Sequence, residues 1–582
     1  MVESAHAAEG ARAGRRRVLK GLGTLGVAGG VLAVAGSKPA TADSGSGSNG
    51  TSVTVAASDS PEVLQNSADW VCSGANDDVV INQAIAQVSG AQADGAGEVF
   101  LLPGDFVLGS GASSFINLSA EYGRLQLRGS GTTATMIHVP SGSAAPAAIV
   151  AASWNATPGT LTVRDLQVSG PGNDGTGATA GVLTQCSEPR LVNVTVNGAA
   201  GHGFVLDGHP LSQDQVGAPA AAGSQYTTWN GHVKDCSVYN CGTAILNGGA
   251  PGDGFHITAQ HQNAAVTDCF VAGGNNGISA ALLTATVAMG DSPSSLSVSP
   301  LPAAFDGGAS LVICGAGSYQ VLTVGSQGAD QGATSIPVSG FTATSDFWGG
   351  LTVVLDPAVT TTRYGFYTQA TTHWNDCHPY FCWHGGFVDE SAAFINGGEY
   401  ETCAFAGISA ILSGTDQYKL GTPDTPLQIL GINSYGNPGV ANIYVWAGTS
   451  GVQICNNLIS GGSSLFGIYN KDGNYHIVTG NHIYDAVGPG PGGYSGSAGI
   501  RYETDGTSGT GVGHVISGNI ISLSSQAPTL TAQHYGISLT GITNSIIQGN
   551  SVSGCASQAN STPIAAQGTS TGTEIVSNPG YN

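Results

Sequence analysis

The sequence predicts an all-β protein built as a solenoid of stacked strands. A six-residue segment of alternating character, Val233-Lys-Asp-Cys-Ser-Val238, returns along the chain in related forms, for example at 266–271 and 374–379. The 582 residues also include 90 glycines and only 9% charged residues, a composition typical of strands and turns. Each repeat is one short strand that can bury its apolar face only against its neighbours, so the repeats are expected to stack as coils.

Aligning the repeats gives two columns of equivalent residues, one expected to point into the solenoid and one that follows it in the chain. The second column becomes asparagine in the later repeats, which suits a ladder of side chains that hydrogen-bond from coil to coil. Glycine and asparagine at one fixed position also suit a tight bend. We expect the cysteines of the first column to be buried and free rather than paired in disulfides. The inward column is expected to contain Leu166, Val194, Cys236, Cys269, Cys377, Cys403, Cys455, Gly480, Gly518 and Gly549, and the next column Asn456, Asn481, Asn519, Asn550 and Asn578.

The charge balance restricts the partners. The chain has 15 basic and 37 acidic residues, a formal net charge of −22. Such a surface repels nucleic acid and also anionic polysaccharide. We therefore expect no nucleic-acid partner.

The N-terminal segment resembles a twin-arginine export signal. It contains Gly14-Arg-Arg-Arg-Val-Leu-Lys20, an apolar glycine-rich run to Gly36, and the cleavage-like Ala40-Thr-Ala42. The run is too short to be a convincing membrane anchor. We expect a signal peptide over 1–42, a flexible leader over 43–66, a secreted extracellular protein, and no membrane partner once the signal is removed.

The first ordered elements resemble a known fold family. Asp77 and Asp78 precede a segment whose Ile81, Ala84, Ile85 and Val88 share one helical face, and the strand-like segment 97–108 follows with Leu102-Pro-Gly104. An acidic-capped helix before a strand that ends in Leu-Pro-Gly resembles the opening of the pectate-lyase-like right-handed parallel β-helix superfamily. The resemblance implies a right-handed parallel β-helix whose end is closed by that helix.

The repeat is interrupted once. The step from Asp268 to Asp376 is about three times the step from Asp235 to Asp268, and strand-like runs separated by turns fill the interval. We expect the β-helix to run over 67–284 and 363–582, with a small β subdomain inserted over 285–362. An insertion of this size often overhangs a functional groove.

One candidate site is a column of carboxylates. Asp235, Asp268 and Asp376 stand before the column cysteines and should point outward. Because neighbouring coils lie about 4.8 Å apart, their separations would approach those of the paired carboxylates of glycosidases. A calcium site and a solvated surface column without chemistry are the alternatives.

A second candidate site is an outward face that follows a Gly-apolar motif. Aromatic and charged side chains in register over several coils would suit sugar rings. The polar-aromatic stretch 373–384 lies directly after the insertion and would floor a cleft together with the carboxylate column. A zinc site of His373, Cys377, His378, Cys382 and His384 is the weaker alternative for that stretch, because strand alternation separates the ligands. The candidate substrate-binding residues are His256, Tyr444, Trp446, Tyr469, Arg501 and Glu503, with Trp374, His378, Trp383 and His384.

The segment Gly252-Asp-Gly-Phe-His-Ile257 resembles the first acidic motif of glycoside hydrolase family 28, the polygalacturonases. The resemblance implies that Asp253 is a fourth candidate catalytic carboxylate. In the position of the family's next, paired aspartates the chain has Asn275 and Asn276.

These observations predict a secreted carbohydrate-active enzyme that cleaves or transfers glycosidic bonds of a neutral polysaccharide or oligosaccharide through paired carboxylates. No cofactor is expected, with calcium as the alternative, and the oligomeric state is left open, a homotrimer included. A polysaccharide lyase is an alternative, but it would need a basic catalytic residue and a cation facing the substrate. A non-catalytic solenoid that binds a glycan is the other alternative.

Overall fold

The computed structural model describes residues 51–579 apart from segments 91–95, 120–123, 154–159, 172–178, 209, 211–214, 219–226, 243–251, 275–279, 316–317, 357–361, 390, 412–426, 447–448, 462–463, 488–495, 505–510, 524–533, 558–560 and 569–570. The predicted export signal and the first part of the leader lie outside the described residues. The chain divides into two compact units, Met1–Asn49 and Gly50–Asn582, and only the second is described below. Within the described residues no helix is long and apolar enough to cross a membrane.

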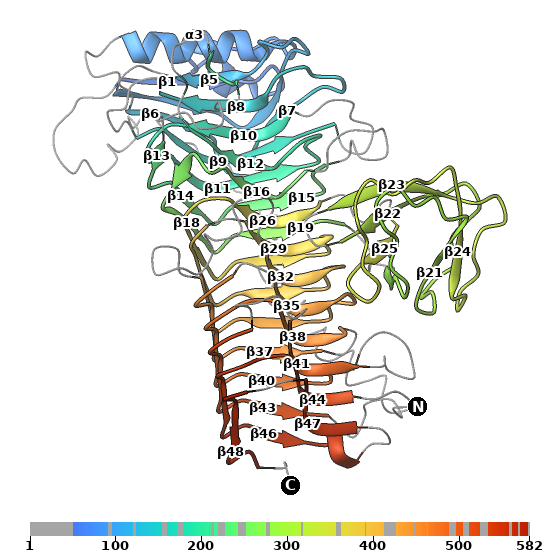
Figure 1. The fold of residues 1–582 in the computed structure, drawn as a ribbon. Helices are drawn as coiled ribbons and strands as arrows, with labels where there is room; N and C mark the ends of the chain where they lie inside the picture. The colour runs from blue at the N-terminus through green and yellow to red at the C-terminus, as the bar shows by residue number, and fades with distance from the viewer. Residues whose placement is uncertain are drawn as a thin grey trace, which may run out of the picture. The chain divides into compact units, whose positions relative to one another are not determined.

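The second unit is a parallel β-helix with an antiparallel subdomain inserted in it (Figure 1). Its two large sheets have 27 and 13 strands, and successive coils pair in parallel throughout both. The predicted all-β solenoid is therefore confirmed. The 13-stranded sheet contains β5 (Ile116–Ser119), β8 (Ala147–Ala152), β10 (Ala180–Gln185), β12 (Phe204–Leu206), β16 (Phe255–Ile257), β26 (Tyr364–Thr368), β29 (His384–Val388), β32 (Ala406–Ala410), β35 (Ala441–Val445), β38 (Phe466–Lys471), β41 (Ser497–Glu503), β44 (His534–Thr540) and β47 (Ser561–Gln567).

The 27-stranded sheet covers the other two sides of each coil, which are joined at a bend. Its first strands are β1 (Thr51–Ala56), β2 (Trp70–Val71), β3 (Ala96–Leu101), β4 (Gly104–Val107), β6 (Arg124–Arg128), β7 (Thr135–His138), β9 (Thr162–Ser169) and β11 (Arg190–Asn197). One ladder then runs through β14 (His232–Lys234), β18 (Ala264–Thr267), β27 (Thr372–Asn375), β30 (Ala393–Asn396), β33 (Leu427–Leu430), β36 (Gln453–Cys455), β39 (Ile477–Thr479), β42 (Val515–Ser517), β45 (Ile546–Gln548) and β48 (Glu574–Val576). The second ladder runs through β15 (Ser237–Tyr239), β19 (Phe270–Ala272), β28 (His378–Tyr380), β31 (Glu399–Glu401), β34 (Asn433–Tyr435), β37 (Leu458–Ser460), β40 (His482–Tyr484), β43 (Ile520–Ser522) and β46 (Ser551–Ser553).

Helix α3 (Asp77–Gly90) packs against the first coils, and its predicted apolar face, from Ile81 to Val88, is buried. Asp77 and Asp78 are also buried, but their carboxylates bind neighbouring backbone instead of capping their own helix. Asp77 accepts hydrogen bonds from the N–H groups of Gly74 and Val107, and Asp78 accepts one from Gly109. The paired aspartates therefore fasten the helix to β4 and the loop that follows it.

Each coil turns between the two ladders through one residue with left-handed backbone. Non-glycine residues rarely adopt this conformation, and aspartate and asparagine tolerate it best. Strand pairing aligns these residues as Asp235 (φ 53°), Asp268 (54°), Asp376 (49°), Gly397 (68°), Gly431 (64°), Asn456 (58°), Gly480 (68°), Gly518 (64°), Gly549 (63°) and Ser577 (52°). The outward aspartate column and the later glycines are thus one structural position.

The next residue of each coil points inward, which corrects the predicted columns. Register pairs Trp374 with Ile395, so the coil after Cys377 presents Gly398 there, and Cys403 belongs to a different bend. Cys455 pairs with Leu430 and is half-buried beside the bend. The column therefore changes from cysteine to asparagine at one inward position, and contains Cys236, Cys269, Cys377, Gly398, Ile432, Asn457, Asn481, Asn519, Asn550 and Asn578.

The predicted asparagine ladder is present, with Asn457 in place of Asn456. The Nδ2 group of Asn457 donates to Oδ1 of Asn481 at 2.9 Å, and Asn481 donates in the same way to Asn519 at 2.9 Å. The chain of bonds continues through Asn550 to Asn578. Each Oδ1 also accepts the backbone N–H of the preceding ladder asparagine, so the buried amides are satisfied by one another.

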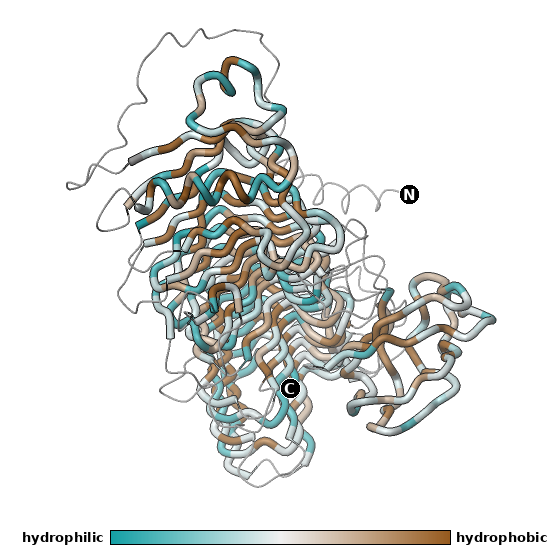
Figure 2. Tube along the Cα trace, turned by 90° about the horizontal axis from the view of Figure 1, so that it is seen from above, coloured by the Kyte–Doolittle hydropathy of each residue, from teal (hydrophilic) through white to brown (hydrophobic). Residues whose placement is uncertain are grey.

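Most of the remaining interior is apolar. Phe204, Phe255 and Phe366 stack from coil to coil with ring centroids 4.9 and 5.1 Å apart, and Trp374 packs beside Phe366. All eleven cysteines are free, the five of the predicted column among them, and all except Cys455 are buried. Figure 2 shows the apolar stretches following the strands of the coils and of the subdomain.

The interruption between β19 and β26 holds an antiparallel six-stranded subdomain with its own core. Its strands are β20 (Ala280–Leu282), β21 (Ser295–Ser297), β22 (Ser310–Cys314), β23 (Tyr319–Val324), β24 (Ser335–Ser339) and β25 (Val353–Leu355). One of its faces joins a cluster of buried residues with the 13-stranded sheet, in which Val312 and Cys314 accompany Tyr364 and Phe387. The remaining described elements are one short parallel strand pair and two short helices. The pair is β13 (Thr228–Trp229) with β17 (His261–Gln262), and the helices are α2 (Glu62–Gln65) and η4 (Cys555–Ser557).

The bend column gives a test of whether its aspartates have a role beyond conformation. Asp268→Gly is expected to keep or raise the free energy of unfolding, by up to about 1 kcal/mol, because glycine adopts left-handed backbone without steric cost. Asp268→Val should lower it by more than about 1 kcal/mol, because a β-branched residue is an outlier there. Urea denaturation measures both variants, and equal destabilisation by glycine and valine would contradict the conformational explanation.

Candidate active site

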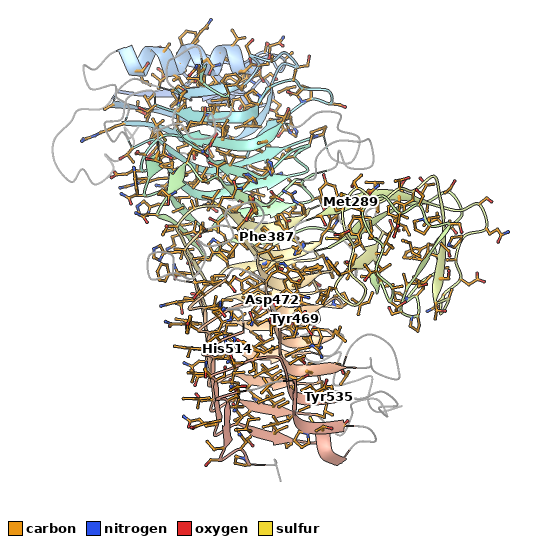
Figure 3. The ribbon with its side chains drawn as sticks, viewed as in Figure 1. Met289, Phe387, Tyr469, Asp472, His514 and Tyr535 are labelled. Atoms are coloured by element: carbon orange, nitrogen blue, oxygen red, sulfur yellow. The ribbon has the colours of Figure 1, made fainter. Side chains whose placement is uncertain are left out.

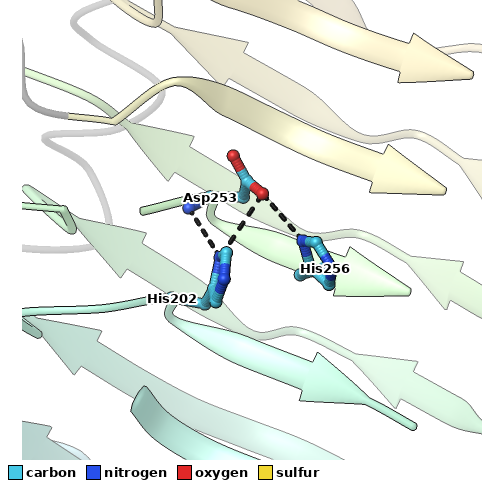
Figure 4. A group of neighbouring side chains, drawn as sticks. All are labelled: His202, Asp253 and His256. Atoms are coloured by element: carbon cyan, nitrogen blue, oxygen red, sulfur yellow. Dashed lines mark hydrogen bonds and ion pairs between the residues drawn. The ribbon is translucent and has the colours of Figure 1, made fainter. Parts of the chain in front are cut away.

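A buried carboxylate lies at the centre of the candidate site, where β12, β16 and β26 begin (Figure 4). Asp253 is completely buried, and its Oδ2 atom lies 2.8 Å from Nδ1 of His256 and 3.3 Å from Nδ1 of His202. The backbone N–H of Asp253 donates to Nδ1 of His202 at 3.0 Å. Strand pairing brings these three residues together because His202 and Asp253 precede paired strands, while His256 lies within β16.

Arg363 closes the cluster from the next coil. Its Nε and Nη2 atoms donate to the two oxygens of Asp253, both at 2.9 Å, in a bidentate ion pair. The guanidinium lies 4.4 Å from the ring centroid of Tyr364. Burial alone would raise the pKa of Asp253, but Arg363 and the two histidines hold it well below its usual value. Asp253 is therefore ionised at neutral pH.

The contact with Asp253 fixes the proton position on the imidazole of His256. An ionised Asp253 accepts the Nδ1 proton of His256, which leaves the lone pair on Nε2 of His256. That nitrogen has no hydrogen-bond partner among the described residues, and the side chain is 19% exposed. Burial, with a smaller effect of His202, lowers the pKa of His256, so the ring is neutral at pH 7 and available as a base.

An aromatic floor continues from this cluster along the 13-stranded sheet. The outward column pairs His256 with Tyr367, then Phe387, Ser409 and Tyr444. The Tyr367 hydroxyl donates to Asp389 at 3.1 Å, and its ring centroid lies 4.7 Å from that of His256. The base and the aromatic residues therefore share one face.

A metal ion does not fit this cluster as it stands. One ligand atom from each of His202, Asp253 and His256 lies within 4.8 Å of the others. However, Arg363 occupies both Asp253 oxygens, and a divalent cation would lie beside a guanidinium. Calcium prefers six to eight oxygen ligands, whereas this group offers one carboxylate and two imidazoles.

Solved structures of similar fold come from proteins of different kinds. The A-modules of the mannuronan C-5 epimerases AlgE6 and AlgE4 of Azotobacter vinelandii match with 16% and 15% identity and TM-scores of 0.45 and 0.43. The matches cover 86% and 87% of this chain, and 95% and 96% of the modules. Tailspike protein 3 of bacteriophage CBA120 matches at 10% identity with a TM-score of 0.39, over 87% of this chain and 59% of the tailspike. The shared feature is the fold alone.

A scan of protein-family models gave no match to the sequence, and a search of curated proteins gave none either. The parallel pairing of successive coils confirms the parallel β-helix fold that the pectate-lyase-like resemblance implied, and the link to family 28 has no further support.

The structure places the predicted carboxylates in two different regions. Asp235, Asp268 and Asp376 are exposed on one column at the bends of the 27-stranded sheet. Asp253 lies at the start of β16 in the other sheet, where it is bound by Arg363. A catalytic role of the bend column stays a prediction. The left-handed backbone at these positions is by itself a sufficient reason for aspartate to occur there.

Several predicted substrate-binding side chains are buried, which corrects their expected exposure. Trp374 faces the interior core, because its position alternates inward in β27. Trp383, His384, Tyr444 and Tyr469 belong to the outer face, but each is at most 1% exposed where the subdomain and the coil loops pack over this face. Figure 3 labels Phe387 and Tyr469 on this stack of coils. Burial lowers the pKa of His384 to about 3, which leaves this histidine neutral.

The other predicted binding residues retain some exposure. Arg501 donates to Glu503 at 2.8 Å through Nε, and the Tyr469 hydroxyl donates to the same carboxylate. His378 lies on the 27-stranded sheet near Glu399 and Glu401. Among the proposed zinc ligands, Cys377 and Cys382 are buried in the interior while His384 belongs to the other sheet, so the structure does not bring that set together.

His202 and Arg363 were not predicted as site residues. His202 stands directly before Gly203-Phe204, as Asp253 does before Gly254-Phe255, and Arg363 is separated from Gly365-Phe366 by one residue, Tyr364. Aligning these pairs would have placed His202, Asp253 and Arg363 on adjacent coils.

Proposed function

We propose that the protein is a polysaccharide-modifying enzyme in which His256 removes the proton next to the carboxylate of a uronate residue. The observation that carries this proposal is the Asp253–His256 pair, which leaves an unpartnered, half-buried Nε2 lone pair on the outer face of the coils. A general base of this kind contributes about 10²–10⁴ in rate. Proton removal is the first step of both β-elimination and epimerisation of uronates.

The neighbouring groups support the same chemistry. As His256 Nε2 takes the C-5 proton, the electron pair of the broken C–H bond moves into the carboxylate, which then carries more negative charge. Asp253 stabilises the imidazolium that forms, and Arg363 is the cation closest to the pair. Asp253 itself is held by Arg363 and fully buried, so it acts through His256 as a positioning residue.

A uronate substrate is anionic, whereas the net charge of the protein led us to expect a neutral glycan. A charge of −22 acts on an approaching polyanion over distance, but at physiological salt the Debye length is about 8 Å. At that salt concentration the charges close to the bound sugar determine its affinity. The affinity for a polyuronate should therefore increase, not decrease, as salt rises from low to moderate concentration.

Cleavage or transfer of glycosidic bonds through carboxylates is the second candidate. It rests on the exposed column of Asp235, Asp268 and Asp376. The carboxylates beside His256 are not available for this role, because both are buried. Asp253 is ion-paired with Arg363, and Asp389 accepts the hydrogen bond of the Tyr367 hydroxyl. Export by the twin-arginine pathway, action outside the cell and a glycan partner belong to either proposal.

The test compares wild type, His256→Gln and the matched control His373→Gln, whose histidine is exposed on the other sheet. Polyuronates in D₂O are followed by NMR for deuterium at C-5 and by ultraviolet absorbance for unsaturated ends. Wild type and control should give one of these signals, and His256→Gln should lose it by about 10²-fold or more. Reducing ends released from a neutral glycan without either signal would support the carboxylate column instead, and binding without turnover would support a non-catalytic solenoid.

The pH profile gives an independent check of the base. Because burial lowers the pKa of His256 below its ordinary value, the rate should be flat around neutral pH and fall only as the pH drops through that lowered pKa. A rate that rises on acidification would contradict a histidine base.

A further inference from the structure

We propose that the cleft between the inserted subdomain and β35 is a second sugar-binding subsite, which holds a distant uronate residue of the chain that reacts at His256. This inference rests on the proposed function, because it assigns the same substrate class to both places. The cleft has a volume of about 140 Å³ and is lined by Gly315, Asp346, Trp348 and Leu351 of the subdomain and by Tyr444 and Trp446 of the β-helix.

Two indoles and an ammonium group give the cleft its chemistry. Lys471 Nζ lies 5.3 Å from the ring centroid of Trp446 and 5.9 Å from that of Trp348. Lys471 makes no ion pair with any residue that the structure describes, so its charge is available to a ligand. Trp348 is 49% exposed, and an exposed indole face next to a cation suits a sugar ring that carries a carboxylate.

One residue that lines the cleft carries a buried hydroxyl without a partner. Tyr444 is completely buried and its ring stacks on Trp446 with centroids 5.6 Å apart, yet its hydroxyl has no hydrogen-bond partner among the described residues. An unsatisfied buried hydroxyl is costly. A ligand hydroxyl at this position would satisfy it, whereas a purely apolar ligand would not.

The cleft and the proposed base lie on one line. The outward column runs His256, Tyr367, Phe387, Ser409 and Tyr444, which is four strand steps. At about 4.8 Å a step the two places are about 19 Å apart. Phe387 and Ser409 between them are buried beneath the subdomain, so one polysaccharide chain would reach both places only by passing around the subdomain, and a disaccharide is too short to do so.

The experiment measures binding and turnover on uronate oligosaccharides of increasing length. Trp348→Ala and Lys471→Gln should raise the Kd of a long polyuronate about tenfold and leave that of a disaccharide unchanged. Trp229→Ala is the control, because Trp229 is 45% exposed but lies in β13 on another sheet. Unchanged affinity for the long chain, or an equal loss on the disaccharide, would overturn the subsite.

Tyr444→Phe separates ligand binding from structure. The variant should bind the long chain more weakly while its own Tm stays the same or rises, because an unpartnered hydroxyl has been removed. A lower Tm together with unchanged binding would mean that the hydroxyl serves the fold.

Titration calorimetry with the His256→Gln variant keeps the two proposals distinguishable. If wild type turns over no uronate but Trp348→Ala still weakens oligouronate binding, the proposed reaction fails and the subsite stands. If turnover occurs but Trp348→Ala and Lys471→Gln bind the long chain like wild type, the subsite alone fails.

Discussion

Replacing Arg363 by methionine is expected to lower the free energy of unfolding by about 3–5 kcal/mol, the usual cost of leaving one member of a buried ion pair without its partner. Asp253 is completely buried and both of its oxygens accept from Arg363, so the variant would leave an ionised carboxylate held only by two histidines and by the more distant Tyr364 N–H at 3.4 Å. Urea denaturation at neutral pH measures the loss.

A double-variant cycle tests the cause. In Arg363→Met/Asp253→Asn no buried charge remains, so the double variant should be more stable than Arg363→Met alone. Arg164→Met is the control, because Arg164 pairs with Asp165 at the surface and should cost no more than about 1 kcal/mol. Strictly additive losses in the cycle would show that the pair is not coupled.

Asn519→Ala is expected to lower the free energy of unfolding by about 3 kcal/mol or more, because it leaves several buried polar groups without partners at about 1–3 kcal/mol each. Asn519 Oδ1 accepts the backbone and side-chain N–H groups of Asn481, and its Nδ2 donates to Asn550 and to the carbonyl of Val478. Asn519 is completely buried, so these groups lie away from bulk solvent.

The matched control is Asn456→Gly, which changes an asparagine that lies outside the ladder. Asn456 is exposed and occupies a bend with φ of 58°, so glycine should be neutral or stabilising there. If the two variants lowered stability equally, the ladder would contribute nothing particular to the fold.

The repeat itself was readable from the sequence, but its register was not. Asp-Cys in the early coils and Gly-Asn in the later ones fill the same two positions, bend and interior, and the predicted columns placed the later copies one residue out of register. Alternation alone does not fix such a displacement when the bend residue has no apolar character. Only the strand pairing shows that Gly480 continues the aspartate column and Asn481 the cysteine column.

The candidate site was predictable in part. Asp253 and His256 were each named from the sequence, but their pairing with His202 and Arg363 depends on which coils are adjacent, and a subdomain separates Asp253 from Arg363 in the chain. Exposure was less predictable. Outward alternation was right for Tyr444 and Tyr469, yet packing over the sheet buries them, and that burial is a tertiary effect without a local signal.

The change of the interior column from sulfur to amide has a consequence for assembly. Cysteine, leucine and valine are interchangeable hydrophobes, so an early coil that docked out of phase would lose packing only. A late coil that docked out of phase would bring a residue other than asparagine opposite a buried amide and leave that amide with unmet donors. In the C-terminal coils the asparagine ladder therefore selects the correct stacking register. In the N-terminal coils the register depends on helix α3 and on the fit of the apolar side chains.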